Sequence, residues 1–410
     1  MPAIRVNRDR LWNSLMEMGE IGGLPHGGCR RLALSDDDGA GRDLFVRWCR
    51  EAGCEIGVDQ VGNVFARRPG WDADAPAVAT GSHLDTQPHG GKFDGIYGVL
   101  AGLEIVRTLN DHGVETRRPI DIVVWTNEEA SRFYPPLTGS SAFAGLLDPA
   151  DVHRVETFDG TLVGDDLRRI GYLGEEVPGS RALDSFVELH IEQGPILEAE
   201  AKTIGVVTRI QGLRFMTVVV SGDDGHAGTL PMSRRRDALV GAARMTLFLD
   251  ELARTTDDAA RITVGSLHVS PNSTSTVPGE VKFTIDLRHP DEATLVALAD
   301  TIQAKLPELA GTSGLGVAIA IGLEKKPVIF DDAISAQIQA AADELGFASR
   351  PILSGAGHDA MNMAPLMPTG MIFIPCAAGI SHNEQENADP DHVAAGADVL
   401  LHVLLERATA

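Results

Sequence analysis

Two kinds of hydrophobic spacing alternate along the first part of the chain. Continuous apolar runs predict buried strands at residues 77–80 and 122–127, and apolar residues at helical spacing predict helices over 7–20, 40–53 and 95–109. Strands that alternate with helices are typical of βαβ units, in which a crossover helix makes successive strands parallel. We therefore expect an α/β fold with a mixed, mostly parallel sheet and flanking helices.

A different order of elements is predicted farther along the chain. The expected elements are strands at 215–220, 261–269, 280–287 and 316–321, with helices at 233–252 and 292–306. Their order, β-α-β-β-α-β, is that of the ferredoxin-like α+β unit. Because this unit begins and ends with a strand, its termini can lie near each other, and it can be inserted into another domain.

The alternating pattern resumes after this unit. Helical spacing predicts helices over 333–345 and 391–406, and an apolar run predicts a strand at 371–374. A chain of 410 residues is also too long for one core and is expected to form two domains. The expected boundaries are 1–211 and 325–410 for a discontinuous domain and 212–324 for the inserted one.

Composition and charge narrow the class of protein. The chain is 43% hydrophobic, and its formal net charge is −23. A field of that sign disfavours nucleic acid and anionic membrane surfaces, so neither is expected as a partner. No apolar run reaches the roughly 18 residues of a membrane helix, and residues 1–10 lack the apolar region of a signal peptide. The four cysteines lack metal or redox spacing and are expected to be reduced thiols of a cytoplasmic protein.

Acidic and histidine side chains follow the first two predicted strands. His83 and Asp85 end the first strand, and Asp94 comes next in a glycine-rich turn. Glu128 and Glu129 follow the second strand. The carboxyl ends of parallel strands meet at one edge of a sheet, where ligands bind. Since adjacent carboxylates are costly to bury without positive charge beside them, this pattern predicts a hydrolase with a pair of metal ions.

Two further histidines stand in comparable places. His190 ends a predicted strand at 186–190, and His382 follows the strand at 371–374. A mixed nitrogen and oxygen ligand set suits zinc, manganese, cobalt or nickel; the five candidates are His83, Asp94, Glu129, His190 and His382. Simpler interpretations are a hydrogen-bonded strand end for His83, a helix N-terminus for Asp94 and a solvated surface for the glutamates.

Six short motifs occur in order along the chain. They are Gly81-Ser82-His83-Leu84-Asp85-Thr86, Gly91-Lys92-Phe93-Asp94-Gly95, Asn127-Glu128-Glu129, Leu189-His190-Ile191-Glu192-Gln193-Gly194-Pro195, His226-Ala227-Gly228-Thr229 and Ser381-His382-Asn383-Glu384. This set resembles the hydantoinase/carbamoylase amidases, which include N-carbamoyl-L-amino-acid hydrolases, β-ureidopropionases and allantoate amidohydrolases. The resemblance spans nearly the whole chain. His190 separates this group from related aminopeptidases and deacylases, which usually have an acidic ligand there.

The resemblance implies two divalent metal ions that share one ligand. His83, Asp94 and His190 would hold one ion. Asp94, Glu129 and His382 would hold the other. These assignments place both ions at the expected sheet edge.

The resemblance also implies roles in catalysis and substrate binding. Glu128 would be the general base, Asp85 would orient His83, and His226 would polarise the substrate carbonyl. The implied substrate-binding residues are Gln193 for the carbamoyl group, Arg288 for the carboxylate, Gly357 in the pocket wall, and His226 and Ser275 from the inserted domain. Ser275 departs from the family, which usually has asparagine there, and Ala130 replaces the glycine usual after the glutamate pair.

These observations predict a metal-dependent amidohydrolase that cleaves the carbamoyl C–N bond of N-carbamoyl amino acids to amino acid, CO2 and ammonia. Allantoate amidohydrolase is the nearest alternative. A related deacylase or peptidase is disfavoured by His190 and Gln193, and a non-catalytic metal-dependent binding protein would not need Glu128.

The inserted domain is expected to act as a lid and dimerisation domain. It carries His226 and Arg288, whereas the metal ligands lie in the other domain, so catalysis would require closure near residues 210–212 and 325–327. The resemblance implies a homodimer.

Overall fold

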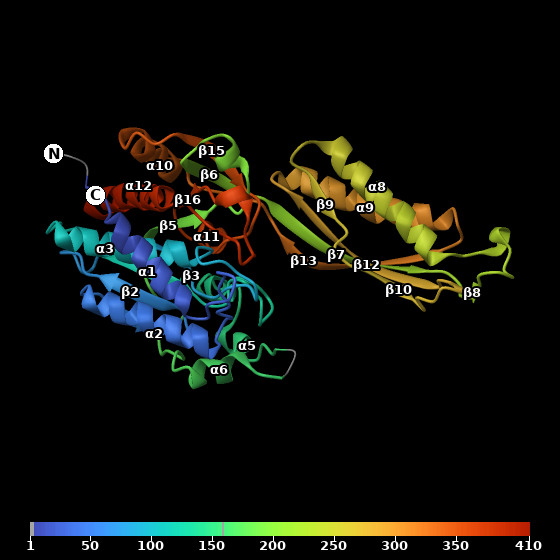
Figure 1. The fold of residues 1–410 in the computed structure, drawn as a ribbon, viewed down its shortest axis with the longest axis horizontal. Coiled ribbons are helices and arrows are strands. Elements are labelled where there is room, and N and C mark those ends of the chain that lie inside the picture. Colours follow the sequence, from blue (N-terminus) through green and yellow to red (C-terminus); the bar gives the residue numbers. More distant parts are fainter. Residues whose placement is uncertain (1–3, 158–159) are drawn as a thin grey trace. The chain divides into compact units, whose positions relative to one another are not determined.

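The computed structural model describes residues 4–157 and 160–410. The chain divides into two units, one formed by Met1–Thr208 with Ile329–Ala410 and the other by Arg209–Val328 (Figure 1). Each unit has a hydrophobic core of its own. Among the described residues, no helix is both long enough and apolar enough to cross a membrane.

The larger unit is built on one mixed sheet. In sheet order the strands are β1 (Glu55–Val58), β2 (Val64–Arg68), β4 (Ile120–Trp125), β3 (Ala77–His83), β5 (Leu183–Ile191), β16 (Thr369–Ile374), β6 (Ile204–Ile210) and β14 (Val328–Ile329), with β15 (Ser349–Ser354) paired to β6. The four strands from β4 to β16 are parallel. They position the candidate site.

Three strand pairs outside this parallel centre are antiparallel. β1 pairs with β2, β2 with β4, and β6 with β16 in antiparallel fashion. The sheet is therefore mixed, as expected, with its parallel strands at the centre. A short turn is enough to join antiparallel neighbours such as β1 and β2, and these short, partly exposed strands give a weak apolar signal.

Helices flank this sheet. The long ones are α1 (Arg8–Glu20), α2 (Asp36–Glu51), α3 (Ile96–Asp111), α10 (Asp332–Glu344) and α12 (Pro390–Thr409). The short ones are α4 (Thr138–Phe143), α5 (Pro149–Val152), α6 (Val163–Arg169), α7 (Ile196–Ala199) and α11 (Ala360–Met363), with the 3-10 turn η2 at Ala377–Gly379. α3 is buried along nearly its whole length. Both α3 and α12 pack on β3 and β5. α2 begins four residues earlier than predicted because the Ser35 hydroxyl caps it by accepting from the backbone N–H of Asp38.

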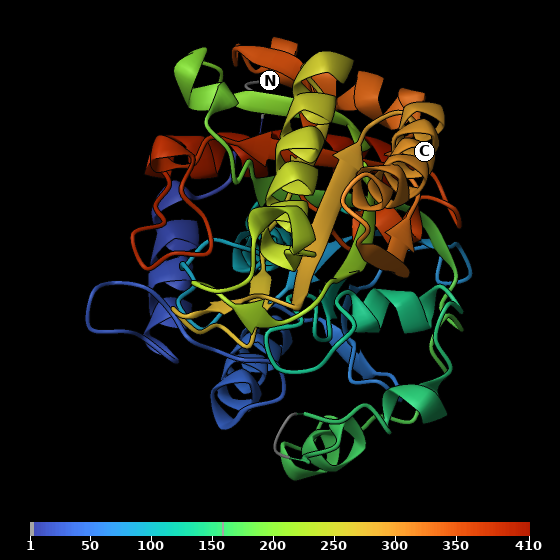
Figure 2. The same ribbon diagram turned by 90° about the vertical axis from the view of Figure 1, so that its right-hand side faces the viewer.

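The smaller unit has an antiparallel sheet with two helices. Its elements are β7 (Gly212–Ser221), β8 (Gly225–His226), the 3-10 turn η1 (Met232–Arg234), α8 (Ala238–Thr256), β9 (Arg261–Thr263), β10 (Leu267–Ser270), β11 (Thr276–Val277), β12 (Glu280–His289), α9 (Glu292–Gly311) and β13 (Gly316–Lys325). The main sheet has the order β10-β12-β7-β13, with β9 also paired to β12. Both helices lie on the same face of this sheet (Figure 1, Figure 2). The strand predicted at 261–269 is in fact two short strands, β9 and β10, with an interruption between them.

Candidate metal centre

The parallel centre of the large sheet brings dispersed polar residues to one edge. β3 ends at His83, which pairs in register with Trp125, the last residue of β4. His190 on β5 pairs in register with Phe373 near the end of β16. Since these strands are parallel and adjacent, the loops that follow them emerge on the same side. Those loops carry Asp94, Glu128, Glu129 and His382.

The first cluster is buried around one oxygen of Asp94. Its Oδ1 lies 3.1 Å from His190 Nε2 and 3.8 Å from His83 Nε2. The ligand atoms of these three residues all lie within 4.8 Å of one another. His83 Nε2 also lies 3.6 Å from Oε2 of Glu128.

The second cluster uses the other oxygen of Asp94. Its Oδ2 lies 3.4 Å from His382 Nε2, which is also 3.4 Å from Oε2 of Glu129. Glu129 accepts a hydrogen bond from the side-chain amide of Gln87 at 2.8 Å. The His382 side chain is 51% exposed, so this cluster is nearer the surface than the first. Asp94 thus faces two ligand clusters with its two oxygens.

Backbone carbonyls orient the two buried imidazoles. Nδ1 of His83 lies 2.8 Å from the carbonyl oxygen of Asp85, and Nδ1 of His190 lies 2.9 Å from that of Ile191. These contacts occupy Nδ1 of each ring, and Nε2 of each ring faces Asp94. Gly95, with φ 71°, leaves room for the ring, because a Cβ there would overlap His83.

The Asp85 side chain makes a different contact from the one expected. Its carboxylate is 3.9 Å from the His83 ring, whereas its oxygens accept from the backbone N–H groups of Glu128 at 3.3 Å and Glu129 at 3.2 Å. The ring is therefore held by the Asp85 backbone, and the Asp85 carboxylate holds the glutamate pair.

Electrostatics at the site favour a bound cation. Burial, followed by the charge of Glu129, raises the pKa of Glu128 well above its usual value. Burial and then the charge of Asp94 do the same to the pKa of Glu129. Burial lowers the pKa of His83 to about 4, so this imidazole is neutral and able to act as a ligand. Buried carboxylates that repel one another, together with neutral imidazole, form a donor set that fits a divalent cation.

Asp94 behaves differently from the two glutamates. Burial opposes its ionisation, but the hydrogen bond with His190 and the positive charge of that imidazole outweigh burial. Its pKa therefore lies far below the usual value. An ionised carboxylate between the two clusters is the state that a shared ligand requires.

Several buried residues around the clusters did not stand out in the sequence. Glu386 accepts hydrogen bonds from the backbone N–H groups of Phe93 at 3.0 Å and Asp94 at 3.1 Å. Glu188, His190 and His358 form a third buried group whose ligand atoms lie within 4.8 Å of one another. Glu188 could have been recognised because it is a charged residue inside an apolar run. Glu386 could not, because no local sequence pattern sets it apart.

Gln193 and Gly357 also lie in the larger unit. The Gln193 amide donates to Asp94 Oδ2 at 2.8 Å, and its buried Oε1 has no hydrogen-bond partner among the described residues. Gly357 follows β15 and precedes the buried His358, and a Cβ there would have no atom within 4 Å. The loop at Gly357 is therefore open to a side chain or a ligand.

His226, Ser275 and Arg288 belong to the smaller unit. His226 lies on β8, which pairs with β11, and the N–H of Ala227 donates to the carbonyl of Ser275 at 2.9 Å. Nδ1 of His226 accepts from the N–H of Gly228 at 3.0 Å, so Nε2 carries the proton of a neutral ring. Arg288 makes a bidentate pair with Asp286, with both N–O distances 2.9 Å.

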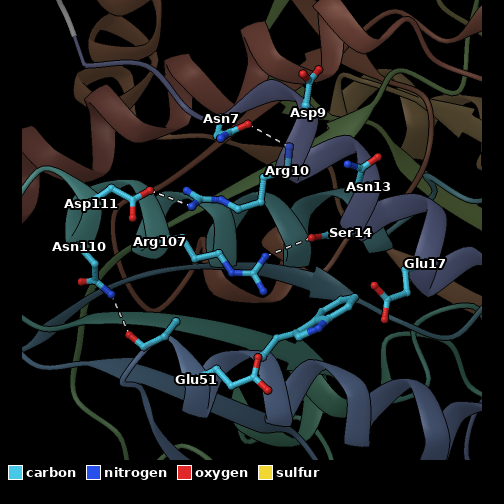
Figure 3. A pocket seen from close by; sticks show the side chains of 12 residues that line it. Asn7, Asp9, Arg10, Asn13, Ser14, Glu17, Glu51, Arg107, Asn110 and Asp111 are labelled. Atoms are coloured by element: carbon cyan, nitrogen blue, oxygen red, sulfur yellow. Dashed lines mark hydrogen bonds and ion pairs between the residues drawn. The ribbon is translucent and has the colours of Figure 1, made fainter.

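A separate cleft of about 730 Å³ lies over α1, α2 and α3 (Figure 3). In it, Arg107 packs on Trp48 and donates to the Ser14 hydroxyl at 3.1 Å. None of the candidate metal ligands lines this cleft. Its size therefore says nothing about the chemistry of the metal centre.

Comparison with known proteins identifies the family. Residues 79–406 match peptidase family M20/M25/M40. The N-carbamoyl-L-amino-acid amidohydrolase of Rhizobium meliloti is 47% identical, with 98% of this chain and 97% of that protein covered. The allantoate amidohydrolase of Escherichia coli K12 is 33% identical, with 98% of each chain covered. A crystal structure of a hydantoinase/carbamoylase family amidase from Burkholderia multivorans has 51% identity and a TM-score of 0.95, with 100% of both chains covered. The chain therefore belongs to peptidase family M20/M25/M40 and, within it, to the hydantoinase/carbamoylase amidases.

Proposed function

We propose that this protein is a metal-dependent amidohydrolase that cleaves the carbamoyl C–N bond of N-carbamoyl amino acids. The observation that carries the proposal is the Asp94 carboxylate, which faces one ligand cluster with each oxygen, beside the half-buried Glu128. The 47% identical relative is named for this reaction. The products would be the amino acid, CO2 and ammonia.

The proposed cofactor is a pair of divalent ions. One would be held by His83, Asp94 and His190, and the other by Asp94, Glu129 and His382. The mixed nitrogen and oxygen donors suit zinc, manganese, cobalt or nickel. When bound, such ions supply Lewis acidity toward water and toward the substrate carbonyl.

Glu128 is the proposed general base. It is half-buried in the loop after β4, and Asp85 holds its backbone in place. Its carboxylate would take a proton from the attacking water and later give that proton to the leaving nitrogen. Its raised pKa makes the carboxylate a stronger proton acceptor than an ordinary glutamate.

Substrate recognition is assigned to residues of both units. Gln193 and the loop of Gly357 would contact the carbamoyl end. Arg288 would bind the substrate carboxylate as a planar fork, the geometry in which it now binds Asp286. The remaining proposed contacts are His226, as a donor to the carbonyl oxygen, and Ser275 beside it.

The smaller unit is the proposed lid and dimerisation domain. In this proposal residues 1–211 and 325–410 form the catalytic domain, residues 212–324 close over it, and hinges lie near 210–212 and 325–327. The active form would be a cytoplasmic homodimer that acts on a small carbamoyl or ureido substrate with a carboxylate. The net charge of −23 argues against nucleic-acid and membrane partners.

Allantoate amidohydrolase is the second candidate. The 33% identical relative with that name supports it. Ser275, which lies where the family usually has asparagine, does not discriminate between the two candidates. A deacylase or peptidase is less favoured because His190 replaces the usual acidic ligand. A non-catalytic metal-dependent binding protein is less favoured because it would not need Glu128.

One substrate panel tests these candidates. Metal-free protein is reloaded with manganese, cobalt, nickel or zinc, and ammonia release is measured from N-carbamoyl α-amino acids, N-carbamoyl-β-alanine and allantoate. The highest kcat/KM is expected for an N-carbamoyl α-amino acid. A higher kcat/KM for allantoate would support the second candidate. Bound metal without turnover of any substrate would support a binding protein.

A further inference from the structure

Glu386 is a buried acidic residue next to the exposed end of the metal centre. It follows His382 by four positions, in the loop between η2 and α12. Glu386 is only 6% exposed, whereas the His382 side chain is 51% exposed. The loop thus presents one candidate ligand near the surface and buries an acid close behind it.

The Glu386 carboxylate connects this loop to the loop of Asp94. Its Oε1 accepts from the backbone N–H groups of Phe93 at 3.0 Å and Asp94 at 3.1 Å. Its Oε2 lies 3.1 Å from the hydroxyl of Ser381, the residue before His382. The same hydroxyl lies 2.8 Å from Asp94 Oδ2 and, having one proton, donates to one carboxylate at a time.

The Asp94 loop is shaped around this carboxylate. A Cβ at Gly91 would overlap Oε1 of Glu386, so glycine leaves the space that Glu386 fills. Gly91 has no positive φ, and its backbone conformation is therefore open to alanine. Replacing Gly91 is consequently a second way to displace Glu386, independent of changing Glu386 itself.

The two ligand clusters depend on this contact to different degrees. His83 and His190 lie on strands of the parallel centre, and backbone carbonyls fix their rings. His382 lies in a loop, with φ 53°, and its ring contacts are with the candidate ligands Asp94 and Glu129. Loosening the His382 loop should therefore affect the second cluster and spare the first.

We infer that Glu386 is a positioning residue that docks the His382 loop on the Asp94 loop and thereby sets the ion affinity of the Asp94–Glu129–His382 site. This inference rests on the two-ion function proposed above. Partners that orient metal ligands typically change metal affinity by about 10–100-fold when they are removed. Glu386 touches neither the substrate nor the reacting atoms in this scheme, so its effect should appear in metal binding before it appears in chemistry.

A cobalt titration tests the inference. Metal-free wild type, Glu386→Ala, Glu386→Gln and Gly91→Ala are titrated with Co²⁺, and bound metal and the visible cobalt spectrum are recorded. Wild type should bind two equivalents. In Glu386→Ala and Gly91→Ala, the first equivalent should bind within about two-fold of wild type and the second at least about ten-fold more weakly. Glu386→Gln keeps an oxygen for the two N–H groups and should recover most of the second-site affinity.

Asp59 provides the matched control. It is also a buried carboxylate, and it accepts from the backbone N–H groups of Val61 at 3.0 Å and Asn63 at 2.9 Å, in the turn between β1 and β2. Asp59→Ala should lower the melting temperature but leave both cobalt affinities unchanged. Two unchanged affinities in Glu386→Ala or Gly91→Ala would overturn the inference and leave the proposed function standing. A single equivalent in wild type would overturn both the inference and the two-ion proposal.

Discussion

The carboxylate of Asp85 accepts a hydrogen bond from the backbone N–H of Glu128 at 3.3 Å, and its second oxygen binds the next N–H in the same way. Asp85 therefore holds the proposed base through the main chain. Its contact with the His83 ring is made by its own backbone carbonyl, which remains in any Asp85 variant. A variant that changes only the Asp85 carboxylate therefore tests its contact with the Glu128 backbone separately from the carbonyl contact with His83.

Asp85→Asn should lower turnover while the first metal site stays intact. The asparagine oxygen can accept from only one side, and its NH2 group faces an N–H it cannot bind, so the Glu128 loop loses a hydrogen bond. We expect kcat to fall by about ten-fold or more, with unchanged affinity for the first cobalt equivalent. Loss of that first equivalent in Asp85→Asn would show that the carboxylate, not the carbonyl, holds His83.

Glu128→Gln should separate metal binding from chemistry. The amide keeps the size of the side chain but cannot take a proton from water, and general base catalysis typically contributes about 10²–10⁴-fold. We expect kcat to fall by at least about 100-fold with two metal ions still bound, as measured by metal analysis of the assayed sample. A variant with near-normal kcat would remove Glu128 from its proposed role.

Metal binding should release protons and strengthen as pH rises. In the metal-free protein, burial and the charge of Asp94 raise the pKa of the candidate ligand Glu129 well above its usual value. The pKa of His190 is raised to about 9, because its contact with Asp94 outweighs burial. Ligands must lose their protons to bind metal, so affinity should increase as pH rises toward about 9, the pKa of His190. Calorimetry in two buffers of different ionisation enthalpy would count the released protons.

The raised pKa of Glu386 determines the direction in which pH changes the stability of the metal-free protein. Burial and the charge of Asp94 raise the pKa of the Glu386 carboxyl from 4.5 to about 8. Between these two pH values Glu386 binds more protons in the folded state than in the unfolded state. Its contribution therefore destabilises the metal-free protein progressively as pH rises from about 4.5 to 8. A bound metal ion would offset the negative charge of Asp94, which contributes to this pKa shift. The melting temperatures of loaded and stripped protein should diverge with rising pH, and a constant difference would contradict this account.

Ala130→Gly should stabilise the protein. Ala130 follows the glutamate pair with φ 51°, a left-handed conformation that costs a non-glycine residue about 1–2 kcal/mol. Glycine removes this strain but also gives the unfolded chain more conformational freedom, which offsets part of the stabilisation. The free energy of unfolding should therefore rise by roughly 1 kcal/mol and the melting temperature by about 2 °C. Ala340, exposed within α10, is the control, because Ala340→Gly should lower the melting temperature. A lower melting temperature for Ala130→Gly would contradict the assignment of strain.

Arg288→Lys should weaken substrate binding rather than chemistry. Lysine cannot reproduce the two-pronged contact that Arg288 makes with the Asp286 carboxylate. For an N-carbamoyl amino acid we expect KM to rise by about ten-fold and kcat to change little. The matched substrate is the same molecule with its carboxylate converted to an amide, for which the variant and wild type should have similar kcat/KM. An equal loss on both substrates would exclude a carboxylate clamp.

The sequence alone determined the central strands and long helices around the site and which residues follow those strands. His83 and Glu128 stand out because each closely follows an apolar run, and a buried strand that ends in polar side chains leaves a local signal. The family motifs are local in the same way. The resemblance to the hydantoinase/carbamoylase amidases, carried by those short motifs, is confirmed by relatives that span nearly the whole chain.

The tertiary structure decided which groups contact one another around those residues. Glu386 meets the Asp94 loop although the two lie nearly three hundred positions apart. Asp85 binds the Glu128 backbone with the carboxylate that the family resemblance assigned to His83. The antiparallel edge strands were also missed, because short, partly exposed strands carry little hydrophobic periodicity. Spacing along the chain reports which face a side chain occupies, whereas hydrogen bonds between distant loops depend on how the whole core packs.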